Sequence, residues 1–146
     1  MMIRTFRSAD LTEIMHIWLS ANLKAHDFIP ADYWESHFEQ VQALLPAAEL
    51  YIYEEDAGAL CGFIGMSGDY IAGIFVKEGA RSGGIGKQLL DCVKSFRQSL
   101  TLNVYRKNER AVRFYLRENF TVRSQRLEKD TGEEEYLMEW KRSSDP

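Results

Sequence analysis

Apolar residues recur at helical spacing in the first third of the chain. Leu11, Ile14 and Trp18 lie three and four positions apart after Ser8, whose hydroxyl can cap the start of a helix. A short break follows, and Pro30 suits the first turn of a second helix. The apolar positions expected inside that second helix are Tyr33, Trp34, Phe38, Val41 and Leu45. The pattern therefore predicts two consecutive helices.

Strand-like runs occupy much of the remaining chain. Turns rich in glycine and aspartate separate three of these runs before residue 77, which predicts three antiparallel strands. A helical run then leads to another strand, and such a crossover makes that strand parallel to its neighbour. The expected strands are residues 2–6, 50–54, 60–67, 70–76, 100–104, 121–129 and 136–140. The later helices are expected at residues 85–96 and 109–118, the second capped by Asn108 and ended by Asn119.

The composition fits one soluble globular domain spanning residues 1–146. Hydrophobic residues make up 45% of the chain, which is enough for a sizeable core. The net charge of −4 argues against nucleic acid as the main partner, because phosphate backbones attract a basic excess. Cys61 and Cys92 are isolated, and no export signal or apolar run of about 20 residues is visible. We therefore expect a cytoplasmic protein with reduced thiols and no membrane association.

A glycine-rich turn separates the strand at 70–76 from the helix at 85–96. Its sequence is Arg81-Ser82-Gly83-Gly84-Ile85-Gly86-Lys87. Free backbone N–H groups at the positive end of a helix bind anions, usually phosphates, and Arg81 and Lys87 would add charge. Leu89 stands where a dinucleotide fingerprint needs its third glycine, and the spacing of a nucleotide-hydrolase loop also fails. Taken alone, the segment is either a phosphate site or an ordinary tight loop.

A second segment, residues 103–120, carries the candidate chemistry. Asn108 can cap the following helix by accepting a hydrogen bond from the N–H of Ala111. The phenol of Tyr115 could donate a proton to a leaving thiolate, and it could equally be a core residue beside Phe114.

Together the two segments resemble the GCN5-related N-acetyltransferase (GNAT) superfamily, in particular its small single-domain bacterial members. The shared patterns are R-x-x-G-I-G-K and N-x(4)-N-x-x-A-x-x-F-Y-x(4)-F, and the order of elements matches over nearly the whole chain. The resemblance implies an α/β fold, with a mixed, twisted sheet of about seven strands and helices on both faces. It also implies acetyl transfer from acetyl-CoA to a primary amine by direct attack.

The resemblance also implies roles for individual residues. The backbone amides of the glycine loop would hold the pyrophosphate of acetyl-CoA, and Asn108 would contact the pantetheine arm. The main chain of Ile74, Phe75 and Val76 would bind the pantetheine and the acetyl carbonyl. Tyr115 would protonate the departing CoA thiolate.

The acceptor side is less well defined by the sequence. Many relatives carry a glutamate on the central strand, but residues 71–74 contain no carboxylate. We therefore hypothesise that His26 or Asp69 assists deprotonation of the amine through water, although His26 could be a packing residue. Phe28, Tyr33 and Trp34 have two alternative roles, an apolar wall that selects the acceptor or plain packing. The three histidines lack metal-ligand spacing, so no metal is expected.

Two questions stay open at this level. The acceptor could be a protein N-terminus, a lysine side chain or a small amine, and the protein could be a monomer or a homodimer. The missing strand carboxylate also permits a non-catalytic CoA-binding or interaction module of the same fold. The presence of both Asn108 and Tyr115 in the expected places favours the enzyme.

Overall fold

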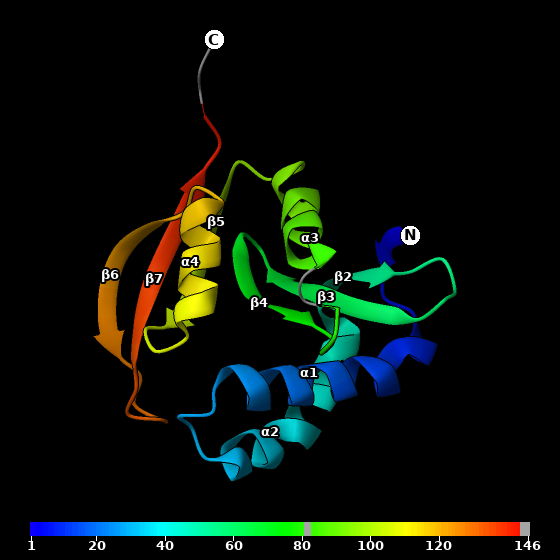
Figure 1. Cartoon of the computed structure of the whole chain (residues 1–146), viewed down its shortest axis with the longest axis horizontal. Helices are drawn as coiled ribbons and strands as arrows, with labels where there is room; N and C mark the ends of the chain where they lie inside the picture. Colours follow the sequence, from blue (N-terminus) through cyan, green and yellow to red (C-terminus); the bar gives the residue numbers. More distant parts are fainter. Residues whose placement is uncertain (81–82, 144–146) are drawn as a thin grey trace.

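A computed structural model describes residues 1–80 and 83–143, and within them seven strands form one mixed sheet (Figure 1). The strand order is β1-β2-β3-β4-β5-β7-β6. The strands are β1 (Met2–Thr5), β2 (Glu49–Glu54), β3 (Leu60–Ser67), β4 (Tyr70–Val76), β5 (Ser99–Tyr105), β6 (Thr121–Leu127) and β7 (Glu134–Lys141). The helices are α1 (Leu11–Ala25), α2 (Ala31–Leu44), α3 (Ile85–Lys94) and α4 (Glu109–Arg117), with single 3-10 turns η1 (Ser8–Asp10) and η2 (Leu45–Ala47).

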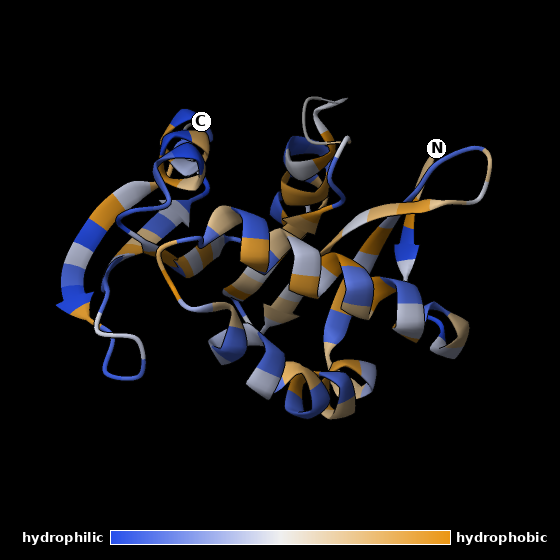
Figure 2. Ribbon diagram, turned by 60° about the horizontal axis from the view of Figure 1, so that its bottom comes forward, coloured by the Kyte–Doolittle hydropathy of each residue, from blue (hydrophilic) through white to orange (hydrophobic). Residues whose placement is uncertain are grey.

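Helices cover both faces of the sheet, as expected from the sequence. Helices α1 and α2 pack on one face around Ile14, Trp18 and Phe63. Helix α3 and Tyr115 of α4 pack on the other face, against Leu102 and Met138. Apolar positions gather along the central strands, whereas the turn between β6 and β7 is mostly hydrophilic (Figure 2). No helix in the described residues is both long and apolar enough to cross a membrane.

The sheet divides between β4 and β5. These parallel strands share only two register pairs, Tyr70↔Thr101 and Ile71↔Leu102, and beyond them no pairing is found. On its other side β4 is paired with β3 over its whole length, with a bulge where Ala72 is the extra residue. The second half of β4 therefore leaves its neighbour β5 while it stays attached to β3.

The start of the first helix differs from the prediction. Ser8 begins the turn η1 rather than capping α1, whose N-cap residue is Asp10. Asp10 supplies the hydrogen bond at this turn, since its carboxylate accepts the backbone N–H of Arg7 at 2.8 Å. Both oxygens of Asp10 are also held by Arg4 of β1, each at 2.9 Å. The ion pair with β1 therefore sets where α1 begins. Pro30 likewise immediately precedes α2 rather than lying in its first turn.

Candidate active site

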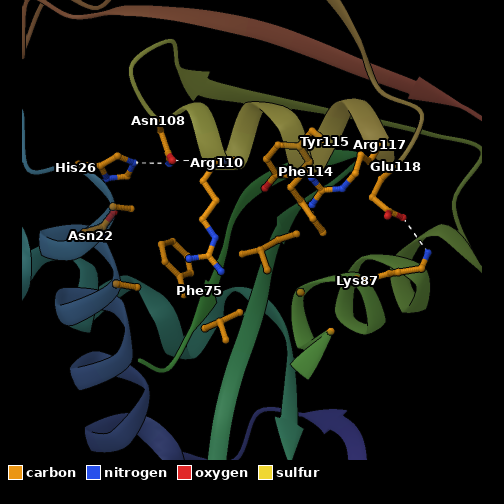
Figure 3. Close-up of a pocket in the computed structure, with 17 residues that line it drawn as sticks. Asn22, His26, Phe75, Lys87, Asn108, Arg110, Phe114, Tyr115, Arg117 and Glu118 are labelled. Atoms are coloured by element: carbon orange, nitrogen blue, oxygen red, sulfur yellow. Dashed lines mark hydrogen bonds and ion pairs between the residues drawn. The ribbon is translucent and has the colours of Figure 1, made fainter. Parts of the chain in front are cut away.

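A pocket of about 530 Å³ lies at the end of the sheet where β4 and β5 separate. Its walls come from the end of α1, the second half of β4, the start of α3 and one face of α4 (Figure 3). These are the elements that carry the glycine turn and the 103–120 segment. The structure therefore brings the two motifs of the sequence to one cavity.

The backbone of β4 presents free polar groups toward the separation. Lys77 donates its backbone N–H to the Cys61 carbonyl at 2.8 Å, which marks a hydrogen-bonded position of the β3–β4 ladder. Such positions alternate in an antiparallel pair, so Phe75 also faces β3. Ile74 and Val76 then direct their N–H and C=O groups toward β5, which has moved away. Of the three main-chain positions expected to bind the donor, Ile74 and Val76 point toward the opening and Phe75 does not.

The Phe75 side chain contributes to the pocket on the α1 and α2 side of the sheet. Its ring packs on Phe63, with ring centroids 4.9 Å apart. The ring also folds back over Gly73, where a Cβ atom would lie 2.3 Å from a ring carbon. Glycine at position 73 therefore permits the ring to lie across the strand and line the pocket.

Helix α3 begins at the pocket with a left-handed glycine. Gly84 precedes the helix with φ +73°, a conformation that side chains other than glycine rarely adopt. Gly86 in the first turn also lines the pocket, and its Cα faces Phe114 and Ile74 closely enough that a Cβ would contact both. The N–H groups of this first turn have no carbonyl partner within the helix, and such groups at the positive end of a helix can bind an anion.

The remaining loop residues are placed as follows. Gly83 donates its N–H to the Ala80 carbonyl at 3.2 Å, and the Ile85 side chain is buried in the core. Arg81 and Ser82, to which the sequence also assigns phosphate binding, lie outside the described residues.

Cationic side chains surround the pocket. Lys87 reaches Glu118 at 3.0 Å and Asp91 at 3.3 Å, so its charge is already partly neutralised (Figure 3). Arg110 and Arg117 also line the pocket, and neither makes an ion pair with any described residue. Sequence reasoning missed both arginines, although their spacing of four and three from Phe114 places all three on one helix face.

Helix α4 positions Asn108 and Tyr115, the two predicted site residues of the second motif. Asn108 caps the helix, since its Oδ1 accepts the N–H of Ala111 at 3.3 Å as expected. Tyr115 is buried and lines the pocket, but its hydroxyl makes no hydrogen bond to a described residue. Burial raises the pKa of Tyr115 well above its ordinary value, so the phenol is protonated at neutral pH.

His26 lies at the end of α1, on the pocket wall opposite Tyr115 (Figure 3). The amide nitrogen Nδ2 of Asn108 is 3.2 Å from His26 Nε2. Because Oδ1 of Asn108 caps α4, Nδ2 must donate, and Nε2 must carry the lone pair. The proton is then on Nδ1, which is buried without a partner among the described residues. Burial lowers the pKa of His26 to about 4, which keeps the ring neutral.

Three other predicted residues belong to an aromatic group around His26 rather than to the lining of the pocket, two by direct contact with His26 and one through Trp34. Trp34 stacks on the His26 ring with centroids 5.2 Å apart, and it is itself 8% exposed. Phe28 contacts His26 edge-on at 5.8 Å, and Tyr33 contacts Trp34 edge-on at 4.9 Å. These aromatic rings thus form one packed group on the α1–α2 side.

Asp69 is placed away from this group. It lies in the turn before β4, at the end of the strand where β4 and β5 are still paired, and its carboxylate is 3.3 Å from Arg97. It is not among the residues that line the pocket. No group of three metal-binding side chains occurs in residues 1–80 and 83–143, and the expectation that no metal is used stays a prediction.

Comparison with known proteins identifies the family. The sequence model described as "Acetyltransferase (GNAT) domain" matches residues 46–122. Peptidyl-lysine N-acetyltransferase YiaC of Escherichia coli (strain K12) is 35% identical over 141 residues, which are 95% of this chain and 96% of that protein. Peptidyl-lysine N-acetyltransferase YjaB of the same strain is 31% identical and covers 89% of this chain and 88% of its own length.

Solved structures agree with this result. The solution structure of apo-form YjaB from Escherichia coli superposes with a TM-score of 0.85 at 28% identity, covering 94% of this chain and 95% of that one. The structure of yncA from Salmonella typhimurium with acetyl-CoA superposes with a TM-score of 0.68, covering 100% and 97%. Its 18% identity supports the fold alone. With its divided sheet, its glycine-started helix and these relatives, the chain belongs to the GNAT family of acetyltransferases.

Proposed function

We propose that this acetyltransferase moves the acetyl group of acetyl-CoA to the side-chain amine of a lysine in a protein. The observation that carries the proposal is the opening between β4 and β5, which lies between the glycine start of α3 and the hydroxyl of Tyr115. The acceptor class is taken from the two relatives that are named peptidyl-lysine N-acetyltransferases and align with most of this chain.

The donor would bind along the opening. Its pyrophosphate would accept hydrogen bonds from the first-turn amides of α3, with Arg110 and Arg117 supplying charge nearby. Its pantetheine arm carries amide groups, which can replace β5 as hydrogen-bond partners of Ile74 and Val76. Asn108 lies at the same wall and would contact this arm.

The reaction would be a direct attack with no covalent enzyme intermediate. The neutral amine attacks the thioester carbon, and negative charge develops on the carbonyl oxygen, where the Val76 N–H can stabilise it. The carbon–sulfur bond then breaks, and the Tyr115 hydroxyl donates its proton to the sulfur. The attacking nitrogen loses one proton to solvent as the amide forms, and a proton from solvent returns Tyr115 to its neutral form. Burial raises the pKa of Tyr115 and so holds the phenol in the protonated form that this step requires.

Two peptides would test the acceptor class. One has a blocked N-terminus and a single lysine, and the other has a free N-terminus and no lysine. Incubation with acetyl-CoA, followed by mass spectrometry, should show one added acetyl group on the first peptide alone. Acetylation of only the second peptide would replace lysine by the N-terminal amine. Binding of acetyl-CoA without acetylation of either peptide, or of free amines, would favour the non-catalytic module.

A further inference from the structure

The proposed reaction requires a base that removes a proton from the ammonium group of the acceptor lysine. A lysine side chain is an ammonium at neutral pH, because its pKa is about 10.4, so a base must produce the neutral amine. Residues 71–74 of β4 contain no carboxylate. His26 has its Nε2 lone pair engaged by Asn108, and Asp69 lies at the far end of β4 beside Arg97. The base must therefore be another residue on the acceptor side of the structure.

On the acceptor side of the structure, a tyrosine is hydrogen-bonded to a carboxylate. Tyr105, the last residue of β5, donates its hydroxyl proton to Glu128 Oε1 at 2.7 Å. Thr131 donates to the same oxygen at 2.8 Å. Glu128 Oε2 receives no hydrogen bond from a described residue. The carboxylate is therefore fixed in orientation by two hydroxyls while half of its acceptor capacity remains free.

This pair lies beside the predicted acceptor wall. The Tyr105 ring contacts His26 edge-on at 5.0 Å and Phe28 edge-on at 5.7 Å. It packs on the same side of the sheet as Phe75, a pocket residue, and it stands on the strand that diverges from the second half of β4. Figure 1 shows the β6–β7 turn, which carries Glu128, next to the connection between α1 and α2.

We propose that Tyr105 and Glu128 form the proton-accepting pair for the acceptor amine, an inference that rests on the proposed function. The ammonium donates an N–H to the lone pair of the Tyr105 hydroxyl as Tyr105 passes its own proton to Glu128. One N–H bond breaks, one O–H bond forms on Glu128, and Tyr105 ends unchanged. The amine keeps its electron pair and attacks the thioester. Glu128 returns the proton to solvent after the product leaves.

The charged surroundings leave Glu128 available for this role. Two cations on neighbouring elements are already paired, Arg126 of β6 with Glu135 of β7 at 2.7 Å and Lys107 with Glu133 at 3.1 Å. The other titratable groups that face the pair are His26, Asp130 in the β6–β7 turn and Tyr33 of α2. Tyr33 lies within hydrogen-bond reach of Tyr105 and within electrostatic reach of Glu128 and Asp130. The His26 ring carries no charge at neutral pH, because burial lowers its pKa to about 4. This negative region favours a cationic acceptor before the proton moves.

The test compares Glu128→Gln with Glu134→Gln, a matched change on β7 at a residue that pairs with Arg106 instead. At pH 7, Glu128→Gln should lower kcat/KM for the lysine peptide about 100-fold, the lower range for general acid–base catalysis, and Tyr105→Phe should act similarly. The kcat/KM of Glu134→Gln should stay within about threefold of the wild-type value, because Glu134 takes no part in the proton transfer. The deficit of Glu128→Gln should shrink as the pH approaches the amine pKa, because solution then supplies neutral amine.

Donor binding gives an independent readout. Acetyl-CoA should stabilise Glu128→Gln against thermal unfolding as much as it stabilises the wild type, since Glu128 does not line the donor pocket. A Glu128→Gln activity equal to that of Glu134→Gln would overturn the pair. A deficit that is constant with pH would also overturn it, because that indicates a structural role. If Glu128→Gln does not fold, Tyr105→Phe decides by the same pH profile. A wild type that acetylates no amine refutes the proposed function instead.

Discussion

Adjacent glycines at the start of α3 allow the energetic cost of its left-handed turn to be measured. Apart from chain neighbours, no heavy atom of the described residues lies within 4 Å of the position that a Cβ would occupy at Gly83 or Gly84, so no contact with the rest of the described structure distinguishes the two positions. They differ in backbone conformation, because Gly84 has φ +73° and Gly83 is not in the left-handed region. Replacing each by alanine therefore isolates the conformational term.

The expected magnitudes follow from that difference. The left-handed conformation costs an alanine about 1–2 kcal/mol. Alanine also restricts the unfolded chain, which stabilises a compatible site by about 0.4–1 kcal/mol, and this benefit applies to both variants. Gly84→Ala should thus be about 1–2 kcal/mol less stable than Gly83→Ala. For a chain of this size that corresponds to a Tm difference of roughly 2–8 °C.

Thermal unfolding of the two variants, with and without acetyl-CoA, measures the stability and the site together. A ligand at 100 times its Kd adds about 2.7 kcal/mol to the stability of the protein that binds it. The added stability should be smaller for Gly84→Ala than for Gly83→Ala, because Gly84 sets the direction of the first-turn amides and lines the pocket. Equal Tm values for the two variants without ligand would refute the conformational argument.

Other predictions concern the pocket residues. Tyr115→Phe should lower kcat while leaving the acetyl-CoA-induced rise in Tm unchanged, and an unchanged kcat would exclude Tyr115 as proton donor. Arg117→Ala should raise the Kd of CoA, most strongly at low salt. Arg113→Ala on the same helix should leave this Kd unchanged, because Arg113 is paired with Glu109 outside the pocket. Titration calorimetry at two salt concentrations measures the Kd of each variant. The pKa of His26 is lowered to about 4 in the folded protein, so as the pH falls below about 6.5 the unfolded chain takes up a proton on this residue before the folded protein does. The free energy of unfolding, measured with denaturant, should therefore fall by about 3 kcal/mol more in the wild type than in His26→Phe between pH 7 and pH 4. Equal decreases in the two proteins would contradict burial of the neutral ring.

The fold was largely predictable because its signals are local. The antiparallel strands Leu60–Ser67 and Tyr70–Val76 have the predicted bounds, since turn residues delimit each of them. Asn119 ends α4 with φ +74°, as its type allows. The predicted start of α1 was wrong. Ser8 has a good local capping propensity, but the ion pair between Asp10 and Arg4 of β1 determines where the helix begins. The bulge at Ala72 depends on pairing across strands, which spacing along the chain does not encode.

Within the site, residues in contiguous motifs were predictable and residues joined only in space were not. Gly84, Gly86, Asn108 and Tyr115 line one pocket, as the motifs indicated. Their roles in binding and catalysis stay predictions. Tyr105 and Glu128 are 23 positions apart and belong to no motif, so only the geometry of the β6–β7 turn reveals their hydrogen bond.

The divided sheet also gives a physical reason for the proposed position of the donor site. Only two register pairs join the strands of the first half, through β4, to those of the second half, through β5. Beyond these pairs the backbone groups of Ile74 and Val76 have no strand partner, and unpaired buried amides destabilise a fold by about 1–3 kcal/mol each. The sheet tolerates this because the separation faces a pocket that solvent can enter. A ligand with its own amide groups can satisfy the same positions from within the opening. The local loss of strand pairing thus leaves the proposed binding surface open, and acetyl-CoA bound there should join the two halves of the sheet as well as bind between them.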